Sequence, residues 1–255
     1  MNLKIDTVGS GPDLVLLHGW GMGAGVWEEL ASVLGARLRV HAVNLPGYGG
    51  SASCTPYSPE CIADELARSL PARCAVCGWS MGGQAALAWA HRAPRQVSRL
   101  ALIATTPSFV RRDHWPHAVE AAVLREFAQA LTADREGTLR RFLALQLLGD
   151  AQARKAAAGL RAHLLRGARP PAAVLADGLA LLLSTDLRAI LGAIAQPALV
   201  LHGDRDRLAP LAAGEFLSAA LLNARLAVVK GAAHAPFVSK ARETGALLEA
   251  FFHER

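Results

Sequence analysis

The strongest chemical signal in the sequence is a serine between glycines, in Gly78-Trp-Ser-Met-Gly82. This G-x-S-x-G pattern follows an apolar run and precedes a segment with helical periodicity, which is the context of a sharp strand-to-helix turn. Glycines on both sides of Ser80 permit such a turn, which would expose the hydroxyl at the edge of a sheet and aim the helix N-terminus at it. A serine hydroxyl is a weak nucleophile. Ser80 therefore needs a base, and the base needs an acid to hold it.

His234 is the best candidate for the base. It lies in the small-residue segment at 231–237, directly after the last predicted strand, where an imidazole could project over the edge of the sheet. Most of the other histidines lie in predicted strands, at helix ends, near residues 114–117 or in the C-terminal tail. The sequence therefore predicts that His234 is the partner of the serine.

The acid is expected in the segment 202–210, which follows the penultimate predicted strand and offers two carboxylates, Asp204 and Asp206. The chain order Ser, Asp, His is that of α/β hydrolases and differs from the orders in chymotrypsin and subtilisin. In many members of that superfamily the loop reads G-x-x-D-x-x-x-P, which is similar to Gly203, Asp206 and Pro210 here. The resemblance favours Asp206 as the acid and leaves Asp204 as a turn-forming or solvated residue.

An acyl-transfer intermediate also needs two hydrogen-bond donors for its oxyanion. The Met81 backbone N–H, at the start of the helix, is expected to be one of them. The segment 17–21 follows an early strand and resembles the H-G-x-G element of the superfamily, which would make the Trp20 N–H the second donor. In that element His18 normally supports the loop and takes no part in catalysis.

Short apolar runs alternate with amphipathic segments along the chain, which is typical of a mostly parallel sheet flanked by helices. The predicted strands are Leu14–Leu17, Val40–Asn44, Cys74–Gly78, Leu100–Ala104, Ala198–His202 and Leu226–Val229. The predicted helices are Val26–Leu34, Pro59–Leu70, Gly82–Arg92, Leu211–Leu221 and Ala241–Phe252. Residues 108–183 contain helical segments without a convincing strand. We therefore expect an α/β core at 1–107 and 184–255 and a helical cap at 108–183, which could cover a site at the C-terminal edge of the strands.

Composition excludes several classes of protein. The 255 residues are 52% hydrophobic, which is enough for one sizeable core. No apolar run approaches the roughly 18 residues of a membrane span. Charges at Lys4 and Asp6 argue against a signal peptide, so a cytoplasmic protein is expected. The net charge of +6 comes mostly from dispersed arginines, which disfavours nucleic acid and leaves either an acidic protein partner or a coding bias.

The four cysteines do not suggest a metal site. Cys74 and Cys77 form a C-x-x-C inside a predicted buried strand, where positions i and i+3 face opposite sides and cannot chelate one ion. No second pair and no spaced histidines accompany them. We therefore expect buried free thiols, no metal and no cofactor.

Five segments together closely resemble one family, the pimeloyl-[acyl-carrier protein] methyl ester carboxylesterases of biotin synthesis, within the α/β hydrolases. They are His18-Gly-Trp-Gly, Asn44-Leu-Pro-Gly-Tyr-Gly, Gly78-Trp-Ser-Met-Gly-Gly, Phe142-Leu-Ala-Leu-Gln and Ala232-Ala-His-Ala-Pro-Phe. The first three are common among α/β hydrolases, whereas the last two are more specific. The resemblance spans essentially the full chain.

The resemblance implies a serine esterase that removes the methyl group from a pimeloyl chain on acyl carrier protein. It implies Ser80 as nucleophile and Asp206 and His234 as its partners. The substrate-binding residues that it implies are Trp20, Ser80, Met81, Phe142, Leu143, Ala144, Leu145, Gln146 and His234. A helical count adds that Leu139, Phe142, Leu143 and Gln146 share one face, with Arg141 nearly opposite.

Basic residues of the cap are expected to meet the acidic carrier protein. The resemblance points to Arg141 and Arg154, and charge alone adds Arg140, Lys155 and Arg161. We expect a monomer that also accepts small esters. Two alternatives stay open: a general short-chain carboxylesterase without a carrier protein, and a hydrolase-like receptor that binds a ligand without turning it over.

Overall fold

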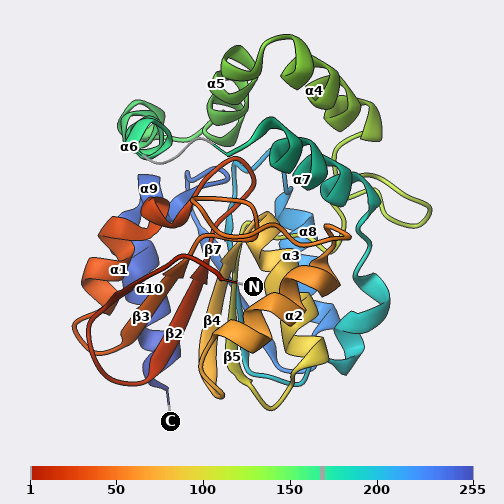
Figure 1. Ribbon diagram of the computed structural model, residues 1–255. Coiled ribbons are helices and arrows are strands. Elements are labelled where there is room, and N and C mark those ends of the chain that lie inside the picture. The colour runs from red at the N-terminus through yellow and green to blue at the C-terminus, as the bar shows by residue number, and fades with distance from the viewer. Residues whose placement is uncertain (1, 167–169, 255) are drawn as a thin grey trace.

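The computed structural model describes residues 2–166 and 170–254. Its centre is a seven-stranded sheet in the order β1-β3-β2-β4-β5-β6-β7, with only β1 antiparallel to its neighbour (Figure 1). The strands are β1 (Ile5–Val8), β2 (Asp13–Leu17), β3 (Arg39–Val43), β4 (Cys74–Trp79), β5 (Val97–Ile103), β6 (Ala198–Gly203) and β7 (Ala224–Val229). Because β2 to β7 run parallel, the loops that follow them meet at one edge of the sheet.

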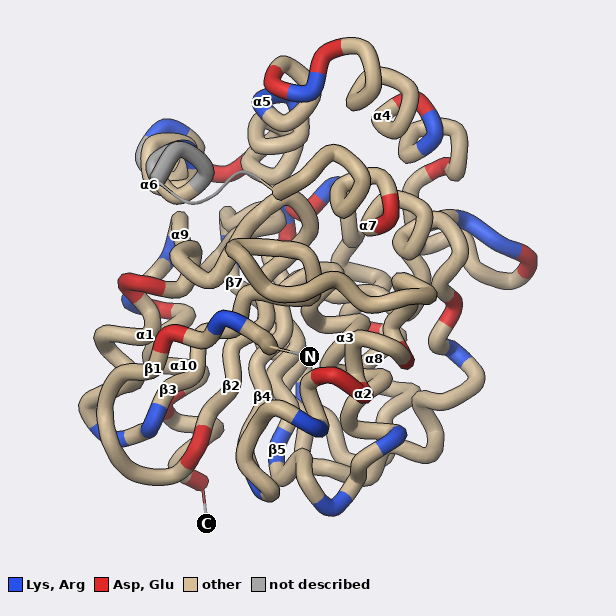
Figure 2. Tube along the Cα trace, viewed as in Figure 1, with Lys and Arg blue, Asp and Glu red and all other residues tan. Residues whose placement is uncertain are grey.

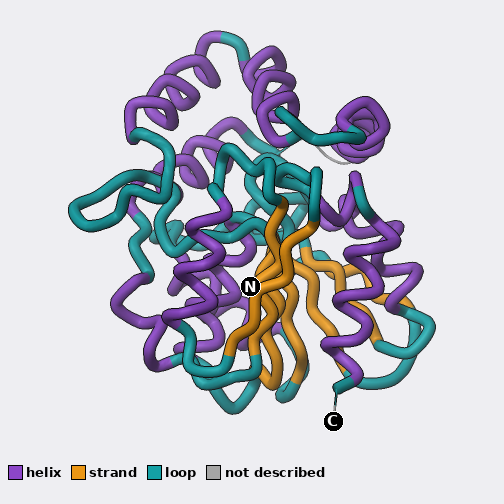
Figure 3. Tube along the Cα trace, turned by 180° about the vertical axis from the view of Figure 1, so that it is seen from behind, coloured by secondary structure: helices purple, strands orange, loops and turns teal. Residues whose placement is uncertain are grey.

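Helices cover both faces of the sheet, as the view from behind also shows (Figure 3). The core helices are α1 (Glu28–Leu34), α2 (Pro59–Ser69), α3 (Met81–Arg92), α8 (Leu211–Ala220), α9 (Pro236–Ser239) and α10 (Ala241–His253). Helices α1 and α10 pack on one face, and α2, α3 and α8 lie on the other. Cys74 and Cys77 lie in the two core clusters on opposite faces, which agrees with the strand predicted for them.

Between β5 and β6 the chain leaves the sheet and forms four helices over the edge where the parallel strands end (Figure 1). They are α4 (Ala121–Ala133), α5 (Arg135–Gln146), α6 (Ala153–Arg166) and α7 (Ala172–Ser184). No helix in the described part of the chain combines the length and the apolar content needed to cross a bilayer.

The structure differs from the predicted elements mainly where side chains are exposed. Strand β1 was not predicted, because it lies at the sheet edge and only Ile5 among its residues is partly buried. Strand β5 begins at Val97, three residues before the predicted start. The prediction started too late because the polar residues Ser98 and Arg99, which are only half-buried, interrupt the apolar run. The predicted helix at 26–34 is a 3-10 turn, Ala24–Trp27, followed by α1.

Candidate active site

Ser80 lies in a sharp turn between β4 and α3, at the carboxyl end of the central strand. Its backbone has φ +56° and ψ −120°, which is rare for a residue with a side chain. The flanking glycines allow close packing, because a Cβ on Gly78 would lie 2.5 Å from the Gly82 carbonyl and one on Gly82 would lie 2.3 Å from the Leu17 carbonyl. The fold therefore holds the strained turn at Ser80 by packing backbone against backbone.

Three side chains from different loops form a chain of hydrogen bonds at this edge. The Ser80 Oγ lies 2.9 Å from Nε2 of His234, and Nδ1 of His234 lies 2.7 Å from Oδ2 of Asp206. All three residues are buried. Because Asp206 accepts from Nδ1, the His234 Nε2 is free to accept the serine proton, which is the arrangement of a general base beside a nucleophile.

The two carboxylates in the loop after β6 have different partners. The second oxygen of Asp206, Oδ1, accepts from the backbone N–H groups of Leu208 and Ala209, at 2.9 and 3.0 Å. Asp204 points elsewhere and accepts from the Gly231 N–H at 2.6 Å. Asp206 is therefore the carboxylate aligned with His234, while Asp204 holds the start of the loop that carries this histidine.

A second histidine, His202, lies beside the same carboxylate without competing for it. Its Nε2 is 2.8 Å from the Ala209 carbonyl oxygen and 3.8 Å from Asp206. Burial lowers the pKa of His202, so the ring stays neutral. The Asp206 carboxylate therefore forms its hydrogen bond to a histidine ring with His234 and not with His202.

The backbone amides of Trp20 and Met81, beside Ser80, have no acceptor within the described residues. Met81 is the first residue of α3, where an amide has no partner inside the helix. The loop that carries Trp20 touches the serine, since a Cβ on Gly19 would lie 3.3 Å from the Ser80 Cβ. These amides can serve as the two donors that an oxyanion requires.

The loop before Trp20 is held by His18. Its Nδ1 donates to the Gly19 carbonyl oxygen at 2.8 Å, and its Nε2 accepts from the Leu45 N–H at 3.1 Å. Burial lowers the pKa of His18 to about 4, so the ring is neutral near pH 7. Both ring nitrogens are occupied, which agrees with the supporting role expected for His18.

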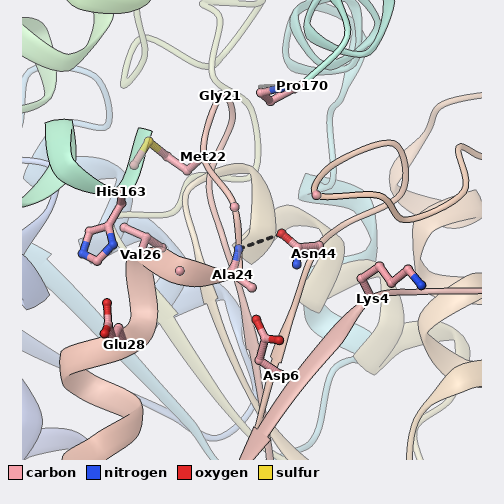
Figure 4. Close-up of a pocket in the computed structure, with 13 residues that line it drawn as sticks. Lys4, Asp6, Gly21, Met22, Ala24, Val26, Glu28, Asn44, His163 and Pro170 are labelled. Atoms are coloured by element: carbon pink, nitrogen blue, oxygen red, sulfur yellow. Dashed lines mark hydrogen bonds between the residues drawn. The ribbon is translucent and has the colours of Figure 1, made fainter. Parts of the chain in front are cut away.

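The far side of the same loop borders a cavity of about 450 Å³ (Figure 4), and Ser80 is not among the residues that line it. Asn44 lines this cavity and its Oδ1 accepts from the Ala24 N–H at 2.9 Å. The cavity is also lined by His163 of α6 and by Pro170, which belong to the helical segment inserted between β5 and β6, called the lobe below. Asn44, which belongs to the predicted N-L-P-G-Y-G segment, therefore fixes the loop that carries Trp20.

Comparisons with known proteins identify the family of the chain. A family model described as alpha/beta hydrolase fold matches residues 12–241. A pimeloyl-[acyl-carrier protein] methyl ester esterase of Nitrosomonas europaea is 43% identical over 238 residues, which are 93% of this chain and 94% of that protein. One of the same name from Aromatoleum aromaticum is 45% identical, over 93% of this chain and 97% of that protein. The chain belongs to this esterase family.

Solved structures show the same fold. An esterase from Exiguobacterium antarcticum superimposes with a TM-score of 0.90 at 23% identity, over 99% of this chain and 96% of that one. The fold predicted for the chain, a mostly parallel α/β-hydrolase sheet with inserted helices, is therefore confirmed.

The esterase's lobe reaches the site through α7 and α5. The Trp20 indole N–H donates to the Leu175 carbonyl oxygen at 2.9 Å, and Gly178 of α7 lets the ring approach, since a Cβ there would lie 2.6 Å from Cδ1. The Phe142 ring of α5 meets the Trp20 ring edge-on, with centroids 4.7 Å apart. These contacts bring the predicted substrate residues of the lobe next to the candidate oxyanion loop.

Not all of the segment 142–146 faces inward. Phe142, Leu143 and Gln146 are buried and Leu145 is half-buried, but Ala144 is exposed. Successive residues of a helix are rotated by about 100° and cannot all face one side. The substrate contact expected of Ala144 stays a prediction.

The basic residues predicted on the lobe lie at its surface. Arg141 and Arg154 are exposed, and the Arg141 guanidinium donates to the Thr138 hydroxyl at 2.9 Å. Arg140 and Arg161 are also exposed, while the Lys155 side chain lies outside the described residues. Lobe contacts of the His234 loop, above all through Asp150, were not predicted. A short-range pattern gives no sign of them, because Asp150 and Ala233 are 83 positions apart.

Proposed function

We propose that this esterase hydrolyses the methyl ester of pimeloyl-[acyl-carrier protein], giving pimeloyl-[acyl-carrier protein] and methanol in biotin synthesis. The observation that carries the proposal is the hydrogen-bonded chain from Ser80 to His234 to Asp206, in a protein whose relatives of that name match it over almost its whole length. We assign Ser80 as nucleophile, His234 as general base and acid, and Asp206 as the residue that orients His234.

The first half of the reaction forms an acyl-enzyme. The Ser80 Oγ attacks the ester carbonyl while the His234 Nε2 takes its proton, and the Asp206 carboxylate stabilises the resulting imidazolium. The oxyanion accepts from the N–H groups of Trp20 and Met81. When the intermediate collapses, the bond to the methoxy oxygen breaks and His234 returns the proton, so that methanol leaves and pimeloyl stays on Ser80.

The second half regenerates the serine. A water molecule gives a proton to the His234 Nε2 and attacks the acyl carbonyl, and the same two amides hold the new oxyanion. Collapse breaks the bond to Ser80 Oγ, which recovers its proton from His234. No metal or cofactor takes part in this sequence.

We also propose that residues 108–183 act as a cap that holds the acyl chain. The contact of Trp20 with Phe142 and its hydrogen bond to Leu175 support a path between the cap and the oxyanion loop. We assign the five cap residues expected at the substrate, Phe142, Leu143, Ala144, Leu145 and Gln146, to this role; Ala144 is exposed, and the other four are buried or half-buried.

We assign Arg141 and Arg154 to contacts with the acidic carrier protein. Both are exposed on the lobe, and Figure 2 marks positions of basic residues along α5 and α6. We further propose a cytoplasmic monomer, which the four free cysteines support because reduced thiols suit that compartment.

The direct test is to incubate methyl-pimeloyl carrier protein with the wild-type enzyme and with Ser80→Ala. We expect wild-type enzyme to release methanol and leave a free carboxylate, detected by intact-protein mass spectrometry. Ser80→Ala should be slower by about 10⁴-fold or more, because no acyl-enzyme can form. Activity of purified Ser80→Ala within tenfold of wild type would refute the nucleophile, and an inactive wild-type enzyme would refute the function.

A further inference from the structure

The loop that carries His234 is held by the lobe as well as by the core. Three hydrogen bonds join it to the segment at 146–151, between α5 and α6. The His234 N–H donates to the Gln146 carbonyl oxygen at 3.0 Å, the Ala233 N–H donates to Asp150 Oδ2 at 2.9 Å, and the Ala151 N–H donates to the Gly231 carbonyl oxygen at 2.9 Å.

Among these three hydrogen bonds, Asp150 contributes the one side chain of the lobe. Both of its carboxylate oxygens accept hydrogen bonds. The residue is 8% exposed, and its other oxygen, Oδ1, accepts from the Gln152 N–H at 2.7 Å. A carboxylate that accepts backbone N–H groups with both oxygens makes charge-assisted bonds, which are stronger than neutral ones. Asp150 therefore joins the turn before α6 rigidly to the His234 loop.

The core holds the same loop through other backbone atoms. Asp204 accepts from the Gly231 N–H, which anchors the beginning of the loop, and the Trp79 indole N–H donates to the His234 carbonyl oxygen at 2.8 Å. The N–H groups of Ala233 and His234 donate to acceptors in the lobe, at Asp150 and Gln146. The N–H groups of Ala233 and His234 thus depend on the lobe, whereas the carbonyl oxygens of Ala232 and His234 accept from the core, from the Arg205 N–H and the Trp79 indole N–H.

We propose that Asp150 is a positioning residue for His234, which couples the placement of the lobe to the alignment of the catalytic base. The inference rests on the proposed function, in which His234 carries the proton. Loss of the carboxylate would leave the buried Ala233 N–H without an acceptor and let the loop move. A displacement of about 1 Å at a catalytic group can cost about 100-fold in rate.

The test compares Asp150→Ala and Asp150→Asn with Asp134→Ala. Asp134 is a matched control, because it is also a lobe aspartate that accepts a backbone amide, from Gly137 at 2.9 Å, and this bond stays inside the lobe. Hydrolysis of p-nitrophenyl acetate reports on the base without involving a carrier protein. The low-field proton NMR signal of the His234 Nδ1–H, bonded to Asp206, reports directly on alignment.

We expect Asp150→Ala to lower kcat by about 10- to 100-fold with KM changed less than threefold, and to shift or broaden the low-field signal. Asp150→Asn, which keeps one acceptor oxygen, should show a smaller loss of the same kind and serves if the alanine variant does not fold. Asp134→Ala should stay within twofold of wild type.

A folded Asp150 variant with wild-type kcat and an unchanged NMR signal would overturn the inference, as would an equal loss in Asp134→Ala. Failure of the proposed function has a different signature. In that case the wild-type enzyme itself would not hydrolyse methyl-pimeloyl carrier protein, while the NMR signal would still report whether Asp150 aligns His234.

Discussion

Asp206 and Asp204 lie two residues apart, yet only one of them meets the imidazole. Asp206 is 2.7 Å from the His234 Nδ1, whereas Asp204 accepts from a backbone amide. The sequence alone could separate them only by the resemblance of Gly203, Asp206 and Pro210 to a family pattern. The structure separates them by contact, and mutation can test the difference.

Asp206→Asn should lower kcat for ester hydrolysis by about 10³- to 10⁴-fold, because an amide neither fixes the required tautomer of His234 nor stabilises the imidazolium. Asp204→Asn should lose less than tenfold, since its amide oxygen can still accept from Gly231. Steady-state kinetics with p-nitrophenyl acetate measures both. A reversal of the two phenotypes would mean that Asp204 is the acid.

His18 makes stability depend on pH. Burial lowers its pKa from 6.5 to about 4 in the folded state, so the unfolded chain binds one more proton between these values. The resulting stabilisation is complete above pH 6.5 and is lost as the pH falls toward 4, by roughly 3 kcal/mol in total. Urea unfolding from pH 7 to pH 4 should show this loss.

His202 contributes in the same direction, because burial lowers its pKa as well. His18→Gln isolates the part of the pH-dependent loss of stability that is due to His18. Glutamine keeps an acceptor for the Leu45 N–H but does not bind a proton in this pH range. The variant should lose less stability on acidification than wild type does. Equal pH slopes for the two proteins would contradict the assignment of His18 as a neutral buried ring.

At the scale of elements, local patterns in the sequence predict the buried strands and the turn at Ser80. They do not predict features that depend on contacts between distant parts of the chain. The parallel strands could be predicted, because each is a short apolar run, and the Ser80 turn could be predicted from its glycines. Strand β1 could not, since an exposed edge strand has no apolar pattern. The bond from Asp150 to Ala233 could not either, because it joins loops that only the folded chain brings together.

The approach of α7 to Trp20 depends on Gly178. A methyl group there would lie 2.6 Å from the buried indole, so Gly178→Ala should displace the ring or the helix and lower kcat/KM by about tenfold through overpacking. Gly192→Ala is the matched control, since a Cβ at that position meets nothing within 4 Å. Kinetics with p-nitrophenyl butyrate would measure both. Unchanged activity in Gly178→Ala would show that the contact of α7 with Trp20 is unimportant for the reaction.

At the scale of the whole molecule, the positive surface of the lobe is expected to guide an acidic partner. Arg141→Glu with Arg154→Glu should raise KM for the carrier-linked ester and lower its kcat/KM by roughly tenfold or more, with little effect on a small methyl ester. Surface ion pairs are weak and screened by salt, so the loss should shrink at high ionic strength.

Arg95→Glu is the control for this charge reversal, because Arg95 is exposed between α3 and β5, away from the lobe. It should leave both substrates unaffected. Equal losses on both substrates in the Arg141 and Arg154 variant would mean that the lobe itself is damaged, which thermal unfolding would reveal.

The central claim is that this hydrolase recognises an ester carried on a protein. The most direct measurement is the ratio of kcat/KM for methyl-pimeloyl carrier protein to that for the methyl ester of free pimelate, at low and at high salt. The account predicts a preference of at least tenfold for the carrier-linked ester at low salt, and a smaller preference at high salt. Equal kcat/KM values for the two esters, independent of salt, would contradict it and favour a general short-chain carboxylesterase.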